Sequence, residues 1–172
     1  MYPYTHVVVG ATIGATLFQQ WRLWLLAALG ALLPDLGMLS HQIYLKSNGL
    51  GWYLWPSSPI WIYTDITHSL VVWCVLLVAS ARLPKVNASN IAFAIGATSH
   101  AVIDVLTHGR NPSKMMTGYL WPFDYNLAVQ LGIWQYHPGR FTILAKPPEL
   151  VMLLTCCGLL ALIIRHKLKA QA

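Results

Sequence analysis

The stretch SHAVIDVLTHG, residues 99–109, places His100, Asp104 and His108 four residues apart within an apolar run. On an α-helix, residues at i, i+4 and i+8 share one face. One carboxylate and two imidazoles therefore point the same way from a segment that otherwise reads as buried or membrane-embedded. Polar groups are costly in such surroundings unless something satisfies them, and a metal ion is the commonest answer. The stretch predicts a helix that carries metal ligands.

The composition of the chain is typical of a membrane protein. Of 172 residues, 56% are hydrophobic and 9% are charged, whereas a soluble domain carries about a quarter charged residues. The alternative is a soluble all-α protein with a large core. The cysteines Cys74, Cys156 and Cys157 lie in apolar runs and form neither a disulfide framework nor a zinc-thiolate pattern. No basic face with interleaved aromatic residues is present, so no nucleic-acid partner is expected.

Apolar runs predict an all-α, integral membrane bundle of about five helices, in one domain spanning residues 1–172. The runs cover residues 7–18, 23–33, 66–81, 91–106 and 150–164. Most are short for a perpendicular span, which needs about 20 apolar residues, and the first two are candidates for a hairpin that enters the membrane only part-way. Two long connections, 36–65 and 109–148, are rich in Trp and Tyr. Such residues gather at membrane interfaces, and they also pack loops over helix ends.

The distribution of charge predicts an orientation. If five helices alternate in direction, one side holds six basic residues and no acidic residue, and the other holds five of each. The basic side comprises Arg22, Arg82, Lys85, Arg165, Lys167 and Lys169. Short basic loops stay in the cytoplasm. We therefore expect a multi-pass protein of a bacterial-type inner membrane, with its N-terminus outside, its C-terminus in the cytoplasm and both aromatic loops on the outer side.

The candidate ligands collect towards that outer side. They are His6 before the first helix, Asp35 after the second, His68 at the start of the third, and His100, Asp104 and His108 in the last turns of the fourth. This set suits Zn²⁺ best, with Mn²⁺ or Fe²⁺ as alternatives. Asp104 is the candidate to bridge two ions, with His100 and His68 as terminal imidazoles. Two ions about 3.5–4 Å apart can activate water and stabilise an in-line displacement at phosphorus.

Five short motifs in chain order carry a family resemblance. They are Thr5-His6, LLPD at 32–35, THSL at 67–70, SH-x3-D-x2-T-x-G at 99–109 and LWPF at 120–123. They resemble the motifs of the YdjM-like, LexA-regulated inner-membrane metal-dependent hydrolases, a family similar in motif logic to the zinc-dependent phospholipase C fold. The resemblance implies metal ligation by His6, Asp35, His68, His100 and Asp104.

The chain departs from that family pattern at two places. Gly37 and Met38 stand where the family often has a second Asp and a His, and Tyr63, Thr64 and Asp65 stand where it often has His-Arg-Gly. Asp65 and His41 are candidates to compensate, and a reduced metal count is the alternative. His108 is a further candidate ligand that rests on its spacing alone, and it is also a candidate to contact substrate.

Each candidate ligand has a structural alternative. A buried His can be a hydrogen-bonded core residue, Asp35 can terminate a turn after Pro34, and Asp65 can be a helix N-cap. The functional expectation is a hydrolase in which Asp104, His100 and His68 act through metal-activated water on a phosphoester, or less favourably an acyl ester, of a membrane lipid or other amphiphile. The alternative is a non-catalytic, metal-stabilised membrane protein or partner subunit. A transporter or channel is disfavoured, because polar residues cluster at one end of the helices instead of along their full depth.

Overall fold

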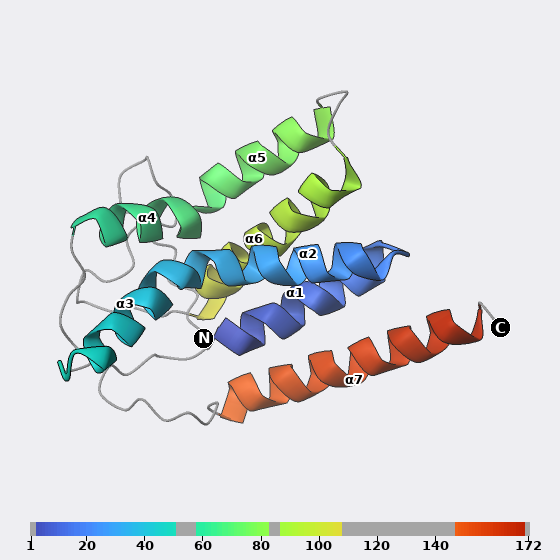
Figure 1. Cartoon of the computed structure of the whole chain (residues 1–172). Coiled ribbons are helices and arrows are strands. Elements are labelled where there is room, and N and C mark those ends of the chain that lie inside the picture. The colour runs from blue at the N-terminus through green and yellow to red at the C-terminus, as the bar shows by residue number, and fades with distance from the viewer. Residues whose placement is uncertain (1–2, 51–57, 83–86, 108–146, 171–172) are drawn as a thin grey trace.

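The computed structural model describes residues 3–50, 58–82, 87–107 and 147–170, and these residues form an all-α bundle (Figure 1). The helices, in chain order, are α1 (Pro3–Leu17), α2 (Trp21–Leu32), the 3₁₀ helix η1 (Leu33–Asp35), α3 (Leu36–Ser47), α4 (Ser58–His68), α5 (Leu70–Arg82), α6 (Ala88–Thr107) and α7 (Pro147–Lys169). The expected fold class is confirmed. The division into about five helices is not, because the described residues form two further helices, α3 and α4, the second of which runs past residue 65 to His68.

The connection expected over residues 36–65 is therefore largely helical. Pro34 does not end the helical segment, because it lies in the first turn of η1, where its missing N–H costs little. The chain continues directly from η1 into α3. The segment from α2 to α3 is one candidate membrane span, Trp21–Ser47, of 27 residues. The second expected aromatic connection, 109–148, lies almost entirely outside the described residues, and no aromatic loop is seen in the described part.

Within the described ranges, three helical segments are long and apolar enough to cross a membrane. They are Trp21–Ser47, Ala88–Leu106 and Leu150–Lys169. A fourth span arises if Ile62–His68 and Leu70–Arg82 are counted together, although they are bent by 56° at a short break. Helix α1, at 15 residues, is not among these candidate spans. The expectation that the second run also enters only part-way is not borne out, because it belongs to the 27-residue candidate span Trp21–Ser47.

Helices α1, α2 and α6 pack together at the centre of the bundle, with α5 against α6 and α7 against α1 (Figure 1). The centre is built from small residues, which let helix backbones approach closely. A Cβ atom added at Gly96 of α6 would lie 1.9 Å from the carbonyl oxygen of Ala27 in α2. One added at Gly30 would lie 2.1 Å from the carbonyl oxygen of Phe93. Glycine at both positions therefore sets the short separation between α2 and α6.

Helix α7 has no buried residue among those whose burial is described, and three hydrogen bonds attach it to α1 and to the residue that follows α1. The Thr12 hydroxyl donates to the Cys156 carbonyl oxygen at 3.2 Å. The Lys167 ammonium donates to the carbonyl oxygens of Ala15 and Phe18 at the C-terminal end of α1. A cation at the C-terminal end of a helix is also stabilised by the negative end of the helix dipole.

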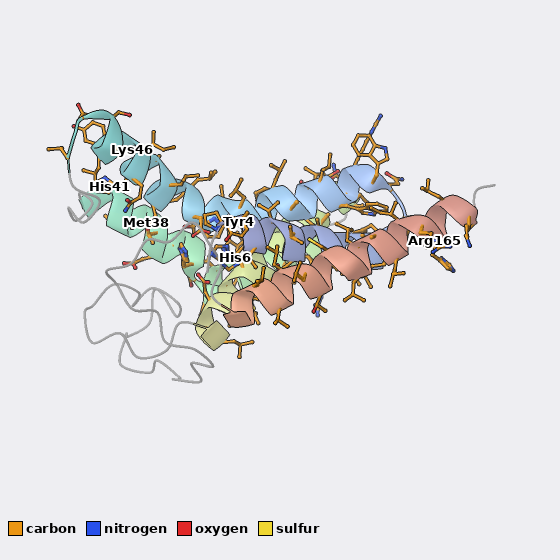
Figure 2. The ribbon with its side chains drawn as sticks, turned by 90° about the horizontal axis from the view of Figure 1, so that it is seen from below. Tyr4, His6, Met38, His41, Lys46 and Arg165 are labelled. Atoms are coloured by element: carbon orange, nitrogen blue, oxygen red, sulfur yellow. The ribbon has the colours of Figure 1, made fainter. Side chains whose placement is uncertain are left out.

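The two ends of the bundle differ in character. The N-terminus of α1, together with α3 and α4, lies at one end, and the α1–α2 turn, the C-terminal end of α5 and the C-terminus lie at the other (Figure 1). His41 and Lys46 of α3 accordingly lie far from Arg165 of α7 (Figure 2). The expected basic residues Arg22, Arg82, Arg165, Lys167 and Lys169 share the second end, and Lys85 lies outside the described residues.

Candidate metal centre

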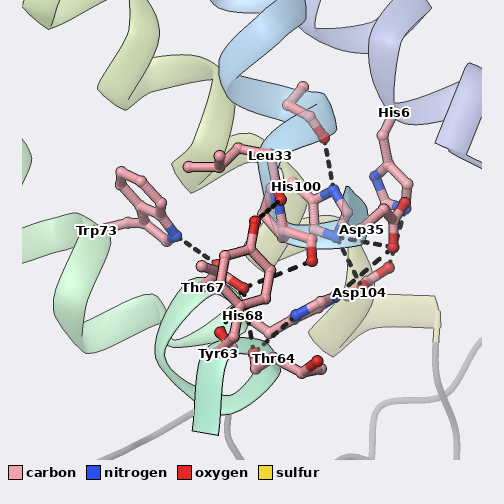
Figure 3. A network of polar contacts seen from close by, with 12 residues as sticks. His6, Leu33, Asp35, Tyr63, Thr64, Thr67, His68, Trp73, His100 and Asp104 are labelled. Atoms are coloured by element: carbon pink, nitrogen blue, oxygen red, sulfur yellow. Dashed lines mark hydrogen bonds and ion pairs between the residues drawn. The ribbon is translucent and has the colours of Figure 1, made fainter. Parts of the chain in front are cut away.

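The structure brings the predicted ligands His6, Asp35, His68, His100 and Asp104 together at the first end of the bundle (Figure 3). His6 lies near the start of α1, and Asp35 closes η1. His68 is the last residue of α4, and His100 and Asp104 lie in the C-terminal half of α6. Residues far apart in sequence therefore meet because several helices begin or end at the same level.

Asp104 is the centre of this cluster. Its Oδ1 atom lies 3.1 Å from Nε2 of His6, and its Oδ2 atom lies 3.2 Å from Nε2 of His100. Nε2 of His68 is 3.7 Å from the same Oδ2 atom. The two carboxylate oxygens thus face different imidazoles, which is the arrangement expected of a bridging carboxylate.

Asp35 supplies the second carboxylate. Its Oδ1 atom lies 3.8 Å from Nε2 of His68 and 3.9 Å from Nε2 of His100. The ligand atoms form two overlapping groups that could each hold a metal ion, His6 with His100 and Asp104, and Asp35 with His68 and His100, and within each group these atoms lie within 4.8 Å of one another. His100 is common to both.

Backbone carbonyl groups orient two of the imidazoles. Nδ1 of His100 is 2.7 Å from the carbonyl oxygen of Ala31, and Nδ1 of His68 is 2.9 Å from that of Thr64. A carbonyl oxygen only accepts hydrogen bonds, so both Nδ1 atoms carry the proton. In the neutral imidazole the Nε2 lone pair then faces the carboxylates. Metal-ligating histidines are oriented in this way, with the second ring nitrogen donating to a carbonyl or carboxylate.

The cluster is almost completely buried, with His100 at 0%, His6 and Asp104 at 1% and His68 at 4% exposure. Among the described residues, Nε2 of His6, His68 and His100 makes no hydrogen bond of good geometry. Imidazole lone pairs and carboxylate oxygens are both acceptors, so their close approach requires a cation between them, either a proton or a metal ion. The rings of His6 and His100 are stacked with centroids 3.7 Å apart, and two protonated rings at that distance would repel each other. The donor set therefore fits a metal ion.

The distances also fit. Four donor atoms, from Asp35, His68, His100 and Asp104, are separated by 3.2–3.9 Å along the four measured edges. Bonds of about 2.0–2.1 Å in a tetrahedral zinc site place neighbouring ligand atoms about 3.3 Å apart. These four distances equal the zinc spacing or exceed it by up to about half an ångström, and the four residues are split between the two ligand groups.

His68 is held differently from the sequence-based expectation. His68 ends α4 instead of starting the following helix, because Ser69 interrupts the helical segment between α4 and α5. The Ser69 hydroxyl accepts a hydrogen bond from the N–H of Val72 at 3.2 Å and so caps α5. The Tyr63 hydroxyl donates to the Leu33 carbonyl at 2.6 Å and fixes α4 against η1.

The other candidates lie outside the two ligand groups or cannot be placed. Asp65 lies in α4 and is partly buried, and His41 is buried in α3, and neither belongs to the two groups described above. His108 lies outside the described residues. Sequence reasoning missed the supporting residues Ala31 and Thr64, because backbone carbonyl acceptors leave no spacing pattern in a sequence.

The chain has one informative similarity to known proteins. Neither a curated protein nor a solved structure matches it. The similarity to a family seen in its short motifs is confirmed over the full length. Residues 1–172 match the family described as YdjM inner membrane protein, and the chain belongs to this inner membrane family.

Proposed function

We propose that this protein is a metal-dependent hydrolase that acts at the membrane surface on a phosphoester of a lipid or other amphiphile. The observation that carries the proposal is the buried convergence of three imidazoles and two carboxylates whose acceptor atoms face one another. Such a set is satisfied by a divalent cation, and two carboxylates neutralise the charge of one such ion. The same chemistry serves an acyl ester, which is the less favoured substrate.

Asp35, His68 and His100 form one group that would hold an ion, and His6, His100 and Asp104 form the second group, with His100 common to both. The mixture of nitrogen and oxygen donors favours Zn²⁺, with Mn²⁺ or Fe²⁺ as alternatives. When bound, such an ion lowers the pKa of a coordinated water and polarises a phosphoryl oxygen. The chain's own contribution is to fix the imidazole tautomers and to keep the donors in a dry, rigid setting.

A lipid or amphiphile is favoured as the substrate because of the position of the site. The Thr12–Cys156 contact places α1 and α7 side by side in the same direction, so His6 lies near the level at which the apolar segment Leu150–Lys169 begins. A site at this level is close to the lipid headgroups. Asp35 has 17% of its side chain exposed and is the most accessible of the five ligands.

The proposed orientation places the site on the outer face, with the N-terminus outside and the C-terminus in the cytoplasm. Support comes from the cluster of basic residues at the opposite end of the bundle, where Arg22, Arg82, Arg165, Lys167 and Lys169 gather. Basic residues next to membrane spans favour the cytoplasmic side. A reporter enzyme fused after Lys169 should be active only in the cytoplasm, and activity outside would refute this orientation.

Metal content tests the proposal most directly. Plasma mass spectrometry on detergent-purified protein, prepared without chelators, should find near-stoichiometric metal in the wild type and little in Asp104→Asn. Asp65→Asn is the matched control, because Asp65 is a partly buried acid close to the site but outside both ligand groups, and it should retain metal. Protein with metal should then release headgroup phosphate or phosphoester from lipid micelles, and Asp104→Asn should not. Wild-type protein that binds no metal would refute the proposal.

The alternative is a metal ion that only pins helix ends together. The near-complete burial of His6, His100 and Asp104 is the observation that favours it, because structural sites are closed whereas catalytic sites keep an open position. Water relaxation measured on the Mn²⁺-loaded protein separates the two functions. An exchanging water in the coordination sphere supports hydrolysis, and its absence supports the structural alternative.

A further inference from the structure

The break between α4 and α5 is bridged by a tryptophan outside the ligand set. The indole N–H of Trp73 donates to the carbonyl oxygen of Thr67 at 2.6 Å. Thr67 immediately precedes His68, and Trp73 lies in the first turn of α5, so this hydrogen bond crosses the break at Ser69 (Figure 3). It stabilises a bend of 56° between the two helices.

The same indole ring is anchored to the helix that carries the other ligands. Trp73 is buried and packs in one cluster with Ala97 and Ala101 of α6. Its ring meets that of Phe93 edge to face, with centroids 6.3 Å apart. Ala97 and Ala101 flank His100 along α6. One side chain therefore touches both the backbone next to His68 and the helix of His100 and Asp104.

The position of His68 depends on this bend. Its Nδ1 atom is tied to the Thr64 carbonyl of its own helix, so the ring moves with the last turn of α4. Its Nε2 atom lies 3.8 Å from Oδ1 of Asp35 and 3.7 Å from Oδ2 of Asp104. Both distances exceed the spacing of about 3.3 Å between neighbouring ligand atoms of a zinc site. A small rotation of the last turn would move this nitrogen out of reach.

We infer that Trp73 is a positioning residue for the metal centre. Through its hydrogen bond to the Thr67 carbonyl, Trp73 holds His68 within reach of the ion. The inference rests on the metal binding proposed above and adds a residue that makes no contact with the metal. Groups that orient a metal ligand without touching the metal typically change metal affinity 10–100-fold when removed. We expect an effect of this size for Trp73→Phe, which keeps an aromatic ring but removes the N–H donor.

The chain offers a matched control at the opposite end of the bundle. The indole N–H of Trp24 donates to the carbonyl oxygen of Phe18 at 2.8 Å, across the turn between α1 and α2. Trp24→Phe removes the same kind of hydrogen bond far from the ligands. It should leave metal affinity unchanged, whatever it does to stability.

The experiment measures the dissociation constant for Co²⁺ by competition with a chelator and records the visible spectrum of the Co²⁺-loaded protein. Trp73→Phe should bind Co²⁺ at least tenfold more weakly than the wild type, and its spectrum should shift towards that of His68→Ala. In the His68→Ala background, Trp73→Phe should cause no further loss, because both changes then act on the same ligand. A purely structural tryptophan would show additive losses and an unshifted spectrum.

Three outcomes would overturn the inference. These are wild-type affinity and spectrum in Trp73→Phe, an equal loss of affinity in Trp24→Phe, and additive losses in the double variant. If Trp73→Phe does not fold, Ser69→Ala removes the α5 cap at the same break and should shift the spectrum in the same direction, and an unshifted spectrum would overturn the inference. Wild-type protein that binds no Co²⁺ and contains no other metal overturns the proposed function and this inference together, whereas the outcomes above overturn the inference alone.

Discussion

Replacing Gly96 by alanine should disturb the candidate metal centre, although Gly96 is not one of the five candidate ligands. The added Cβ atom would lie 1.9 Å from the Ala27 carbonyl oxygen, and real Cβ atoms do not approach closer than 3.0 Å. Because the obstacle is backbone, α6 must move away from α2 by at least about 1 Å, as the steric limits of close packing require. The movement lies in the direction that separates His100 from Ala31.

The consequence for the site follows from the same distance. The His100 Nδ1···Ala31 O separation of 2.7 Å would grow to about 3.7 Å, which is no longer a hydrogen bond. His100 then loses the contact that fixes its tautomer and ring orientation, so metal affinity should fall about 10–100-fold. Overpacking costs about 1–3 kcal/mol, and the gain in helix propensity returns about 1 kcal/mol. The net loss of about 0–2 kcal/mol should lower the unfolding midpoint by up to about 8 °C.

Gly158→Ala is the matched control for this prediction. Gly158 also lies within a helix, but nothing lies within 4 Å of a Cβ atom added there. The substitution should leave metal affinity unchanged and should leave stability unchanged or raise it by up to about 1 kcal/mol. Chelator competition and thermal unfolding in detergent measure both quantities. Wild-type affinity in Gly96→Ala, or an equal loss in Gly158→Ala, would refute the argument from close helix packing.

Three further predictions concern individual contacts. His100→Ala should cause the larger loss of metal, because His100 is common to both ligand groups, whereas His6→Ala leaves the group of Asp35, His68 and His100 intact; equal losses measured by mass spectrometry would contradict this difference. Lys167→Met should lower stability by about 1–2 kcal/mol, since it removes the charged donor to the end of α1, and chelator competition should find its metal affinity unchanged. Removal of metal by a chelator should lower the unfolding midpoint of the wild type more than that of His100→Ala, because only a protein that binds the ion is stabilised by it; an equal shift in both would show that the chelator acts elsewhere.

The relative placement of His100 and Asp104 could be predicted from the sequence because both lie in one regular helix. Residues four apart in α6 necessarily share a face, and their side chains lie 3.2 Å apart in the structure. The collection of ligands at one end also followed from the sequence, since apolar runs of similar length that alternate in direction bring their ends to common levels. Regular local geometry was sufficient for both conclusions.

The positions of Asp35 and His68 within their helices could not be predicted in this way. Pro34 suggested an end to the helix, but a proline early in a helical turn is tolerated and the chain continues through η1 into α3. The apolar run beginning at Ile66 suggested a helix start, but the start is displaced to Leu70 by the contacts of Ser69 and Trp73. Both outcomes depend on short-range details, a proline in the first turn and contacts across the break at Ser69, which the apolar pattern does not resolve.

The helix ends at η1 and at Ser69 explain how imidazoles are oriented in a protein with few polar side chains. At a helix end the last carbonyl groups lack their usual backbone donors. The 3₁₀ partner of the Ala31 carbonyl would be position 34, where proline has no N–H, and this carbonyl accepts the proton of His100 instead. His68 uses the Thr64 carbonyl in the last turn of α4. Among the described residues, His6 has no such partner on Nδ1. The centre therefore divides into a part held by backbone carbonyls, at His68 and His100, and a less constrained part at His6, which should release its ion first as chelator concentration rises.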